Sequence, residues 1–174
     1  MVAAHETGDA IEKLRENGIA ALMFARRVSM GLLEDISDDQ FFHQLFQGAN
    51  HAAWIVGHIC LNDDRFLTGL EGRPSQLPAG WAALFAAGSS PGAESDQHPT
   101  REQMMTQFEA RRNELLRWFQ EMPTEKLTSP VPDDWKTFGA THGMIMSTLA
   151  WHEGLHAGQL TVIRKSLGIV PKFG

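Results

Sequence analysis

Two histidines near the C-terminal end of the chain have a spacing that suits a metal ion. His152 and His156 lie one helical turn apart, and the residues that share their face are mostly apolar. An amphipathic helix turns such a face into the core. The Cβ atoms of an i,i+4 pair lie about 5–6 Å apart, so two imidazoles can bind the same ion. The face comprises His142, Ile145, Leu149, His152, His156, Leu160 and Ile163.

An upstream stretch places a third histidine, His58, on a similar face. It has apolar neighbours, and a buried imidazole needs a partner. A metal ion shared with His152 and His156 would supply one. Three imidazoles would leave coordination positions open, as catalytic sites do. For each histidine taken alone, a hydrogen-bonded core residue is the alternative. The upstream face comprises His51, Ile55, His58, Asn62 and Arg65.

Four other residues near these histidines have more than one interpretation. His51 is either a helix cap or a fourth ligand. His142, almost three turns before His152, is too far away to share the ion and is expected to be a core or rim residue. Cys60 points about 200° away from His58, so we expect a small core residue rather than a nucleophile. Arg65 is a candidate for pairing with a substrate carboxylate, although we favour a surface or interface salt bridge.

The segment from His152 to His156 also matches H-E-x-x-H, the zinc-protease motif in which the glutamate is a general base. That mechanism usually takes its third ligand from downstream. Here no His, Asp, Glu or Cys follows His156, so the third ligand must come from upstream and a protease is disfavoured. Glu153 is therefore expected to support the ligands or lie on the surface, and a role in the pocket stays open. The catalytic residues are otherwise unassigned, with Glu153 and Arg65 as the weak candidates.

Apolar periodicity predicts four amphipathic helices and no strand, which favours an all-α four-helix bundle. The expected helices span about 9–34, 50–70, 100–122 and 139–167, with Asn50 capping the second and a Thr100–Gln103 capping box opening the third. The irregular stretch 72–99 holds four prolines, four glycines and one short helix near 81–85. As a crossover it would let the second and third helices run parallel.

Composition limits the classes of protein to consider. The chain has 174 residues, 43% of them hydrophobic, which suits a single soluble domain over residues 1–174. A net charge of −6 argues against nucleic acid or a membrane as partner. No apolar run approaches the ~20 residues that cross a bilayer, and the N-terminus lacks a signal-peptide pattern. One cysteine fits a reducing compartment, so we expect a cytoplasmic protein.

Two motifs together resemble signatures of the DinB-like (YfiT-like) metalloenzyme superfamily. Residues 50–59 read NHAAWIVGHI, and residues 151–160 read WHEGLHAGQL. The resemblance covers the whole chain in order. It implies an up-down-down-up four-helix bundle with a long crossover between the second and third helices. It also implies a metal site formed by His58, His152 and His156, and a homodimer. Zinc or nickel is the first expectation for the ion, with iron as a further candidate.

The same resemblance indicates what the site could do. Relatives include thiol S-transferases that use bacillithiol, mycothiol-dependent maleylpyruvate isomerase and domains of sulfur-transfer enzymes. We therefore expect a metal-dependent enzyme acting on a small molecule, either a thiol S-transferase or a hydrolase, with an external low-molecular-weight thiol as candidate cofactor. The alternatives are a non-catalytic metal-binding or stress-response protein, and a bundle that binds no metal. Segments 72–99 and 123–138 would line the pocket, where Trp81 and Trp135 either face the substrate or cover the core.

Overall fold

The computed structural model describes residues 2–92 and 98–173, and over these residues the chain is helical, with no strand. A single bridge between Pro130 and Thr141 is the one β-type pairing in the described ranges. Residues 93–97 of the expected crossover lie outside the described residues. The elements are α1 (Val2–Leu33), α2 (Ala52–Glu71), α3 (Trp81–Phe85), α4 (Arg101–Glu121), α5 (Thr124–Thr128), the 3-10 helix η2 (Asp133–Phe138) and α6 (His142–Ser166).

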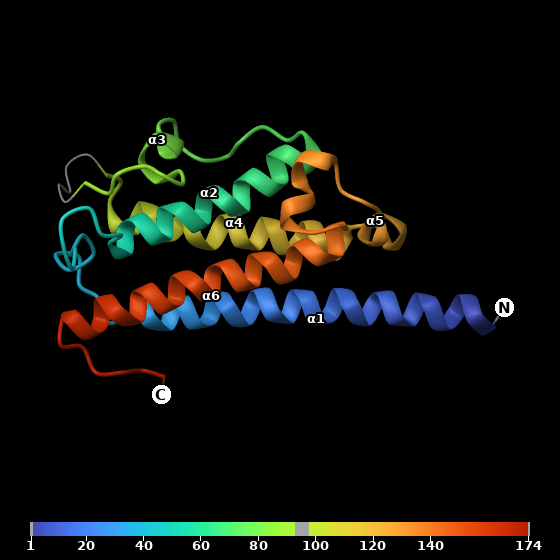
Figure 1. The fold of residues 1–174 in the computed structure, drawn as a ribbon, viewed down its shortest axis with the longest axis horizontal. Coiled ribbons are helices and arrows are strands. Elements are labelled where there is room, and N and C mark those ends of the chain that lie inside the picture. The colour runs from blue at the N-terminus through green and yellow to red at the C-terminus, as the bar shows by residue number, and fades with distance from the viewer. Residues whose placement is uncertain (1, 93–97, 174) are drawn as a thin grey trace.

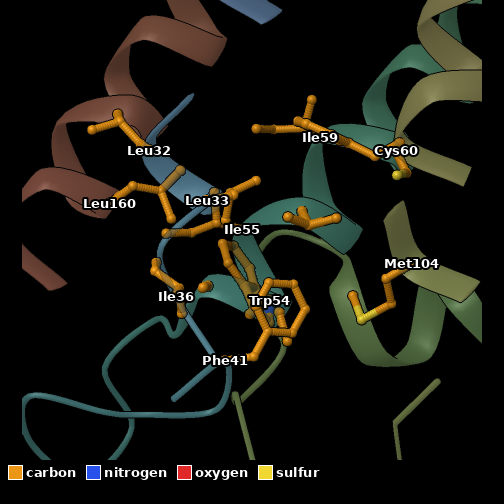
Figure 2. Packing of buried hydrophobic residues seen from close by; sticks show 14 of the residues in the cluster. Leu32, Leu33, Ile36, Phe41, Trp54, Ile55, Ile59, Cys60, Met104 and Leu160 are labelled. Carbon is orange, nitrogen blue, oxygen red and sulfur yellow. The ribbon is translucent and has the colours of Figure 1, made fainter. Parts of the chain in front are cut away.

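The four long helices form two packed pairs. α1 runs alongside α6, and α2 runs alongside α4, while α3 lies on the outside of α2 (Figure 1). The buried apolar side chains fall into two clusters, one toward each end of the bundle. Figure 2 shows the first cluster, in which Leu32, Trp54 and Leu160 from different helices converge. The second cluster is centred on Leu22, Phe66, Leu115, Phe119, Ile145 and Leu149.

Helix boundaries agree with expectation except at three starts. α6 begins at His142, with Thr141 as its N-cap, rather than at about residue 139. α1 begins near the start of the chain rather than at about residue 9, because the alanines at positions 3 and 4 favour helix. The N-cap of α2 is His51, not Asn50: its Nδ1 accepts a hydrogen bond from the backbone N–H of Trp54 at 3.0 Å. The capping box of Thr100 and Gln103 and the short helix at 81–85 are both confirmed.

No helix in the described ranges has both the length and the apolar character that crossing a bilayer requires.

Candidate metal centre

The fold brings together the three histidines predicted to bind metal. His58 comes from α2, and His152 and His156 come from α6, with one ring nitrogen of each within 4.8 Å of the others. The Nε2 atoms of His152 and His156 are 3.2 Å apart. A tetrahedral ion with metal–nitrogen bonds of about 2.0–2.1 Å holds two nitrogens roughly 3.3 Å apart. The spacing of this pair is therefore that of two ligands of one ion.

Hydrogen bonds behind two of the rings orient them for this role. His58 donates from Nδ1 to the carbonyl of Phe85 at 2.8 Å, and His156 donates from Nδ1 to Oε1 of Gln159 at 2.9 Å. Because Nδ1 carries the proton in each ring, the Nε2 lone pair is left for the cluster. Gln159 is itself held by the amide of Asn50 at 3.4 Å. Such outer contacts fix the tautomer and direction of a metal-ligating histidine.

A glycine brings α3 close enough to α2 to provide the carbonyl behind His58. A Cβ on Gly57 would lie 2.4 Å from the ring of Phe85, a distance that no side chain tolerates. The indole N–H of Trp81 donates to the Gly57 carbonyl at 2.9 Å and ties the two helices together. The ring of Trp54 stacks on His58, with centroids 4.6 Å apart and 9° between the planes. Both neighbours restrict the rotation of the His58 ring.

Burial keeps all three histidines in the neutral state that metal ligation needs. His58 and His156 are 7% and 5% exposed, and His152 is half-buried. Burial lowers the pKa of His58 and of His156 from the ordinary value. Burial, reinforced by repulsion from His156 and His58, lowers the pKa of His152 to about 4. At neutral pH the three rings therefore carry no positive charge that a cation would have to overcome.

Asn62 contacts the cluster in a way that sequence reasoning did not anticipate. It lies one turn after His58 on α2, and its amide nitrogen donates to His58 Nε2 at 3.1 Å and to the His58 carbonyl at 2.9 Å. Its position on the same helix face as His58 was the available signal. Two donors on a short side chain thus both bind one histidine.

Glu153 is fully buried, so its interpretation as a surface residue is wrong. Its Oε1 lies 2.8 Å from Nε of Arg26, and its Oε2 lies 2.7 Å from Nη2 of Arg112. Asp63 binds the same two arginines, at 3.1 Å from Arg26 and at 3.0 Å from both Nε and Nη2 of Arg112. Because arginines hold both of its carboxylate oxygens, Glu153 supports the bundle beside the ligands rather than being presented to a pocket.

Each of the four long helices contributes one residue to this group, which we call the charged quartet: Arg26, Asp63, Arg112 and Glu153. Sequence reasoning missed Arg26, Asp63 and Arg112, although each interrupts an apolar stripe; Arg112 follows Phe108 and precedes Leu115 on one face of α4. Burial lowers the pKa of Arg112, but Asp63 and Glu153 more than offset this and raise it overall. The quartet carries two positive and two negative groups, so it is electrically balanced in the core.

Arg65 lies away from the three histidines. It is exposed, and its guanidinium lies over the rings of Trp135 and Phe138, at 5.3 and 5.4 Å from their centroids. Among the described residues, no carboxylate forms a salt bridge with it, so within this chain a cation–π contact stands where a surface ion pair was favoured. A salt bridge at an interface stays a prediction. Trp135 covers Gly69 of α2, and Trp81 is buried, so both tryptophans cover the core.

The other residues near the site have structural roles. His51 uses both ring nitrogens, one for the cap and the other for the Gly92 carbonyl at 2.9 Å, so it is a cap rather than a fourth ligand. His142 is buried beside the Ser129 carbonyl, 3.2 Å away, and outside the three-histidine group. Cys60 is fully buried, and burial raises the pKa of its thiol, as befits a core residue.

Comparison with known proteins identifies the superfamily of the chain. The family model of the DinB superfamily matches residues 21–160, a span that contains the three histidines, Asn62 and the charged quartet. Because the match covers most of the chain, the chain belongs to the DinB superfamily. No curated protein matches the chain.

Proposed function

We propose that this member of the DinB superfamily binds one divalent metal ion through His58, His152 and His156 and uses it as an enzyme on a small molecule. The observation that carries the proposal is the convergence of three imidazole nitrogens within 4.8 Å. Two of the rings are oriented from behind by hydrogen bonds. An all-imidazole donor set suits zinc, nickel and iron. We propose zinc or nickel first and iron next.

A divalent ion at such a site is a Lewis acid that lowers the pKa of a water or thiol reaching its open positions. The protein's own residues prepare the site for this. The Phe85 carbonyl and Gln159 hold two rings in direction, and burial keeps the rings neutral. His152 is the most exposed of the three, so a small molecule approaches the group from its side.

The reaction we propose is thiol S-transfer or hydrolysis. Cys60 is buried with a raised pKa, so a sulfur nucleophile would have to be an external low-molecular-weight thiol. One observation favours the alternative of a non-catalytic metal-binding or stress-response protein: the acidic residue beside the ligands, Glu153, is fully paired with Arg26 and Arg112. Measured turnover separates these two functions.

The finer architecture is part of the proposal. We propose an up-down-down-up bundle forming a single domain over residues 1–174. In Figure 1, α2 and α4 both begin at the end of the bundle where α1 finishes, and α6 begins at the opposite end and runs parallel to α1, which supports this order. We also propose a homodimer, supported by the exposed Trp151 and Leu155 on α6, which are 65% and 50% exposed. The proposed location is the cytoplasm.

Metal content tests the site directly. Protein purified without an affinity tag should contain about one ion per chain by elemental analysis. His152→Ala should lose the ion while its circular dichroism stays helical. His142→Ala removes a buried histidine of the same helix that lies outside the group, so this control should keep the ion. A wild-type protein that neither contains nor takes up a divalent ion would exclude the metal site.

Turnover then tests the enzyme. Metal-loaded protein is assayed for thiol consumption with a panel of electrophiles and for hydrolysis of a panel of esters. We expect one of these activities, its loss on chelation, and its absence from His152→Ala. A metal-loaded wild type that turns over neither panel would favour the non-catalytic alternative.

A further inference from the structure

Asn62 binds the same nitrogen of His58 that a metal ion would use. Because His58 Nδ1 donates to the Phe85 carbonyl, Nε2 carries the lone pair and accepts from the Asn62 amide at 3.1 Å. The second N–H of the amide donates to the His58 carbonyl at 2.9 Å. Both N–H groups of the Asn62 amide are therefore hydrogen-bonded to His58.

A lone pair serves one partner at a time, so an ion at His58 Nε2 displaces the hydrogen bond from Asn62. The bond to the His58 carbonyl does not involve that lone pair and continues to hold the amide beside the group. Metal binding therefore leaves one N–H of Asn62 without its acceptor. Asn62 is half-buried, and a donor in that setting needs a new acceptor.

We propose that the N–H of Asn62 released by metal binding donates to an anion held at the open position of the ion. The inference rests on the proposed function and deepens it, because it selects anionic ligands such as a thiolate over neutral ones. A hydrogen bond to a charged acceptor is stronger than one to a neutral acceptor. Binding of the ion therefore makes this N–H of Asn62 available to bind the anion.

The competing arrangement turns the amide round, so that Oδ1 becomes a fourth ligand of the ion. That rotation would give up both hydrogen bonds to His58. The two arrangements predict opposite effects on metal affinity. Removing a competing donor tightens metal binding, whereas removing a ligand weakens it.

The test uses the metal-free full chain titrated with Co²⁺, followed by titration of the Co²⁺-loaded protein with azide, both read from the d–d absorption. Asn62→Ala should bind Co²⁺ about two- to tenfold more tightly, because one competing hydrogen bond is gone. It should bind azide about tenfold or more weakly, because a bond to an anion is lost. Asn62→Leu, which keeps more of the side-chain volume, is measured in parallel and should behave in the same way.

Gln159→Ala is the matched control, since Gln159 orients His156 from the opposite side of the ring. It should weaken Co²⁺ binding about 10- to 100-fold and leave the azide affinity of the loaded protein unchanged. An azide affinity unchanged in both Asn62 variants overturns the inference. So does weaker Co²⁺ binding by Asn62→Ala together with tighter binding by Asn62→Asp, the signature of an Oδ1 ligand.

The two proposals fail in different ways. A wild-type protein that binds no Co²⁺ removes the metal site and this inference with it. A wild type that binds Co²⁺, with Asn62 variants that match it in both titrations, leaves the metal site standing and removes only the role of Asn62. Thermal melts by circular dichroism confirm that each variant is folded before titration.

Discussion

Replacing Arg112 with methionine tests whether the charged quartet holds the four helices together. The side chain is 2% exposed and makes four polar contacts. It binds Asp63 through Nε and Nη2 at 3.0 Å each, reaches Glu153 at 2.7 Å, and donates to the Leu22 carbonyl at 3.0 Å. Methionine keeps an unbranched apolar stem but removes the charge. Two carboxylates would then share Arg26 alone.

The expected loss of stability follows from the burial of the partners. Asp63 and Glu153 are 1% and 0% exposed, so water cannot solvate the charge that remains. Removing one partner of a buried ion pair costs about 3–5 kcal/mol. Domains have unfolding free energies of about 5–15 kcal/mol, so this is a large fraction of the total. For a chain of this size, the melting temperature should fall by about 6–20 °C.

Urea unfolding followed by circular dichroism measures the change, and Arg73→Met is the matched control. Arg73 also faces a carboxylate, Glu114 at 3.5 Å, but its side chain is 41% exposed. An exposed pair contributes about 0–1 kcal/mol, so the control should be nearly neutral. If Arg112→Met loses no more than Arg73→Met, the quartet does not stabilise the bundle as argued.

A double variant examines the balance of charge. Arg112→Met combined with Asp63→Leu leaves Arg26 and Glu153, which form a neutral pair at 2.8 Å. Its loss of stability should be smaller than the sum of the two single losses, because the second substitution removes the charge that the first left unpaired. Additive losses would contradict the electrostatic explanation.

Three further predictions concern the caps and the site. Burial lowers the pKa of His51 to about 4, so below pH 6.5 the unfolded chain binds more protons than the folded one, and the free energy of unfolding decreases as the pH is lowered. His51→Asn, which keeps a cap acceptor, should therefore lose about 2 kcal/mol less than the wild type between pH 7.5 and 5 in urea unfolding. Gly57→Ala should push α3 away from α2 and displace the Phe85 carbonyl that orients His58, so Zn²⁺ binding measured by calorimetry should weaken about 10- to 100-fold. In Gly154→Ala the added Cβ meets no neighbour, so this control should bind Zn²⁺ as the wild type does. Zn²⁺ at 100 times its Kd should add about 2.7 kcal/mol to the unfolding free energy of the wild type and nothing to that of His152→Ala.

Outcomes opposite to these are equally measurable. An unchanged acid sensitivity in His51→Asn would mean that other groups dominate acid unfolding. Equal Zn²⁺ affinity in the two glycine variants would mean that the contact between α2 and α3 does not position the histidine ring.

The three histidines were predictable because each position is set within one helix. Periodicity alone places His152 and His156 on one face of α6 and His58 on the inner face of α2. Packing of α2 and α6 in one bundle then brings them together. The long helices were predictable for the same reason, since apolar stripes and the Thr100 capping box are local signals.

The charged quartet was not predictable in the same way, because its members come from four helices. A buried charge on one helix carries no sign of which opposite charge faces it. The role of Glu153 follows only from the packing of α1 and α4, which places Arg26 and Arg112 against its carboxylate. Asn50 was expected to cap α2 because asparagine is the more common capping residue, and His51 was left as either a cap or a ligand. In the structure the Nδ1 atom of His51 caps the helix.

The carbonyl of Phe85, which orients His58, belongs to α3 in the connection between α2 and α4. Surface connections accept insertions and deletions more readily than helices do during evolution. A change in this connection would therefore alter the direction of a ligand ring without any substitution among the three histidines. Divergence of the connection gives this architecture a route to new substrates or metals while the bundle and its donor set stay the same.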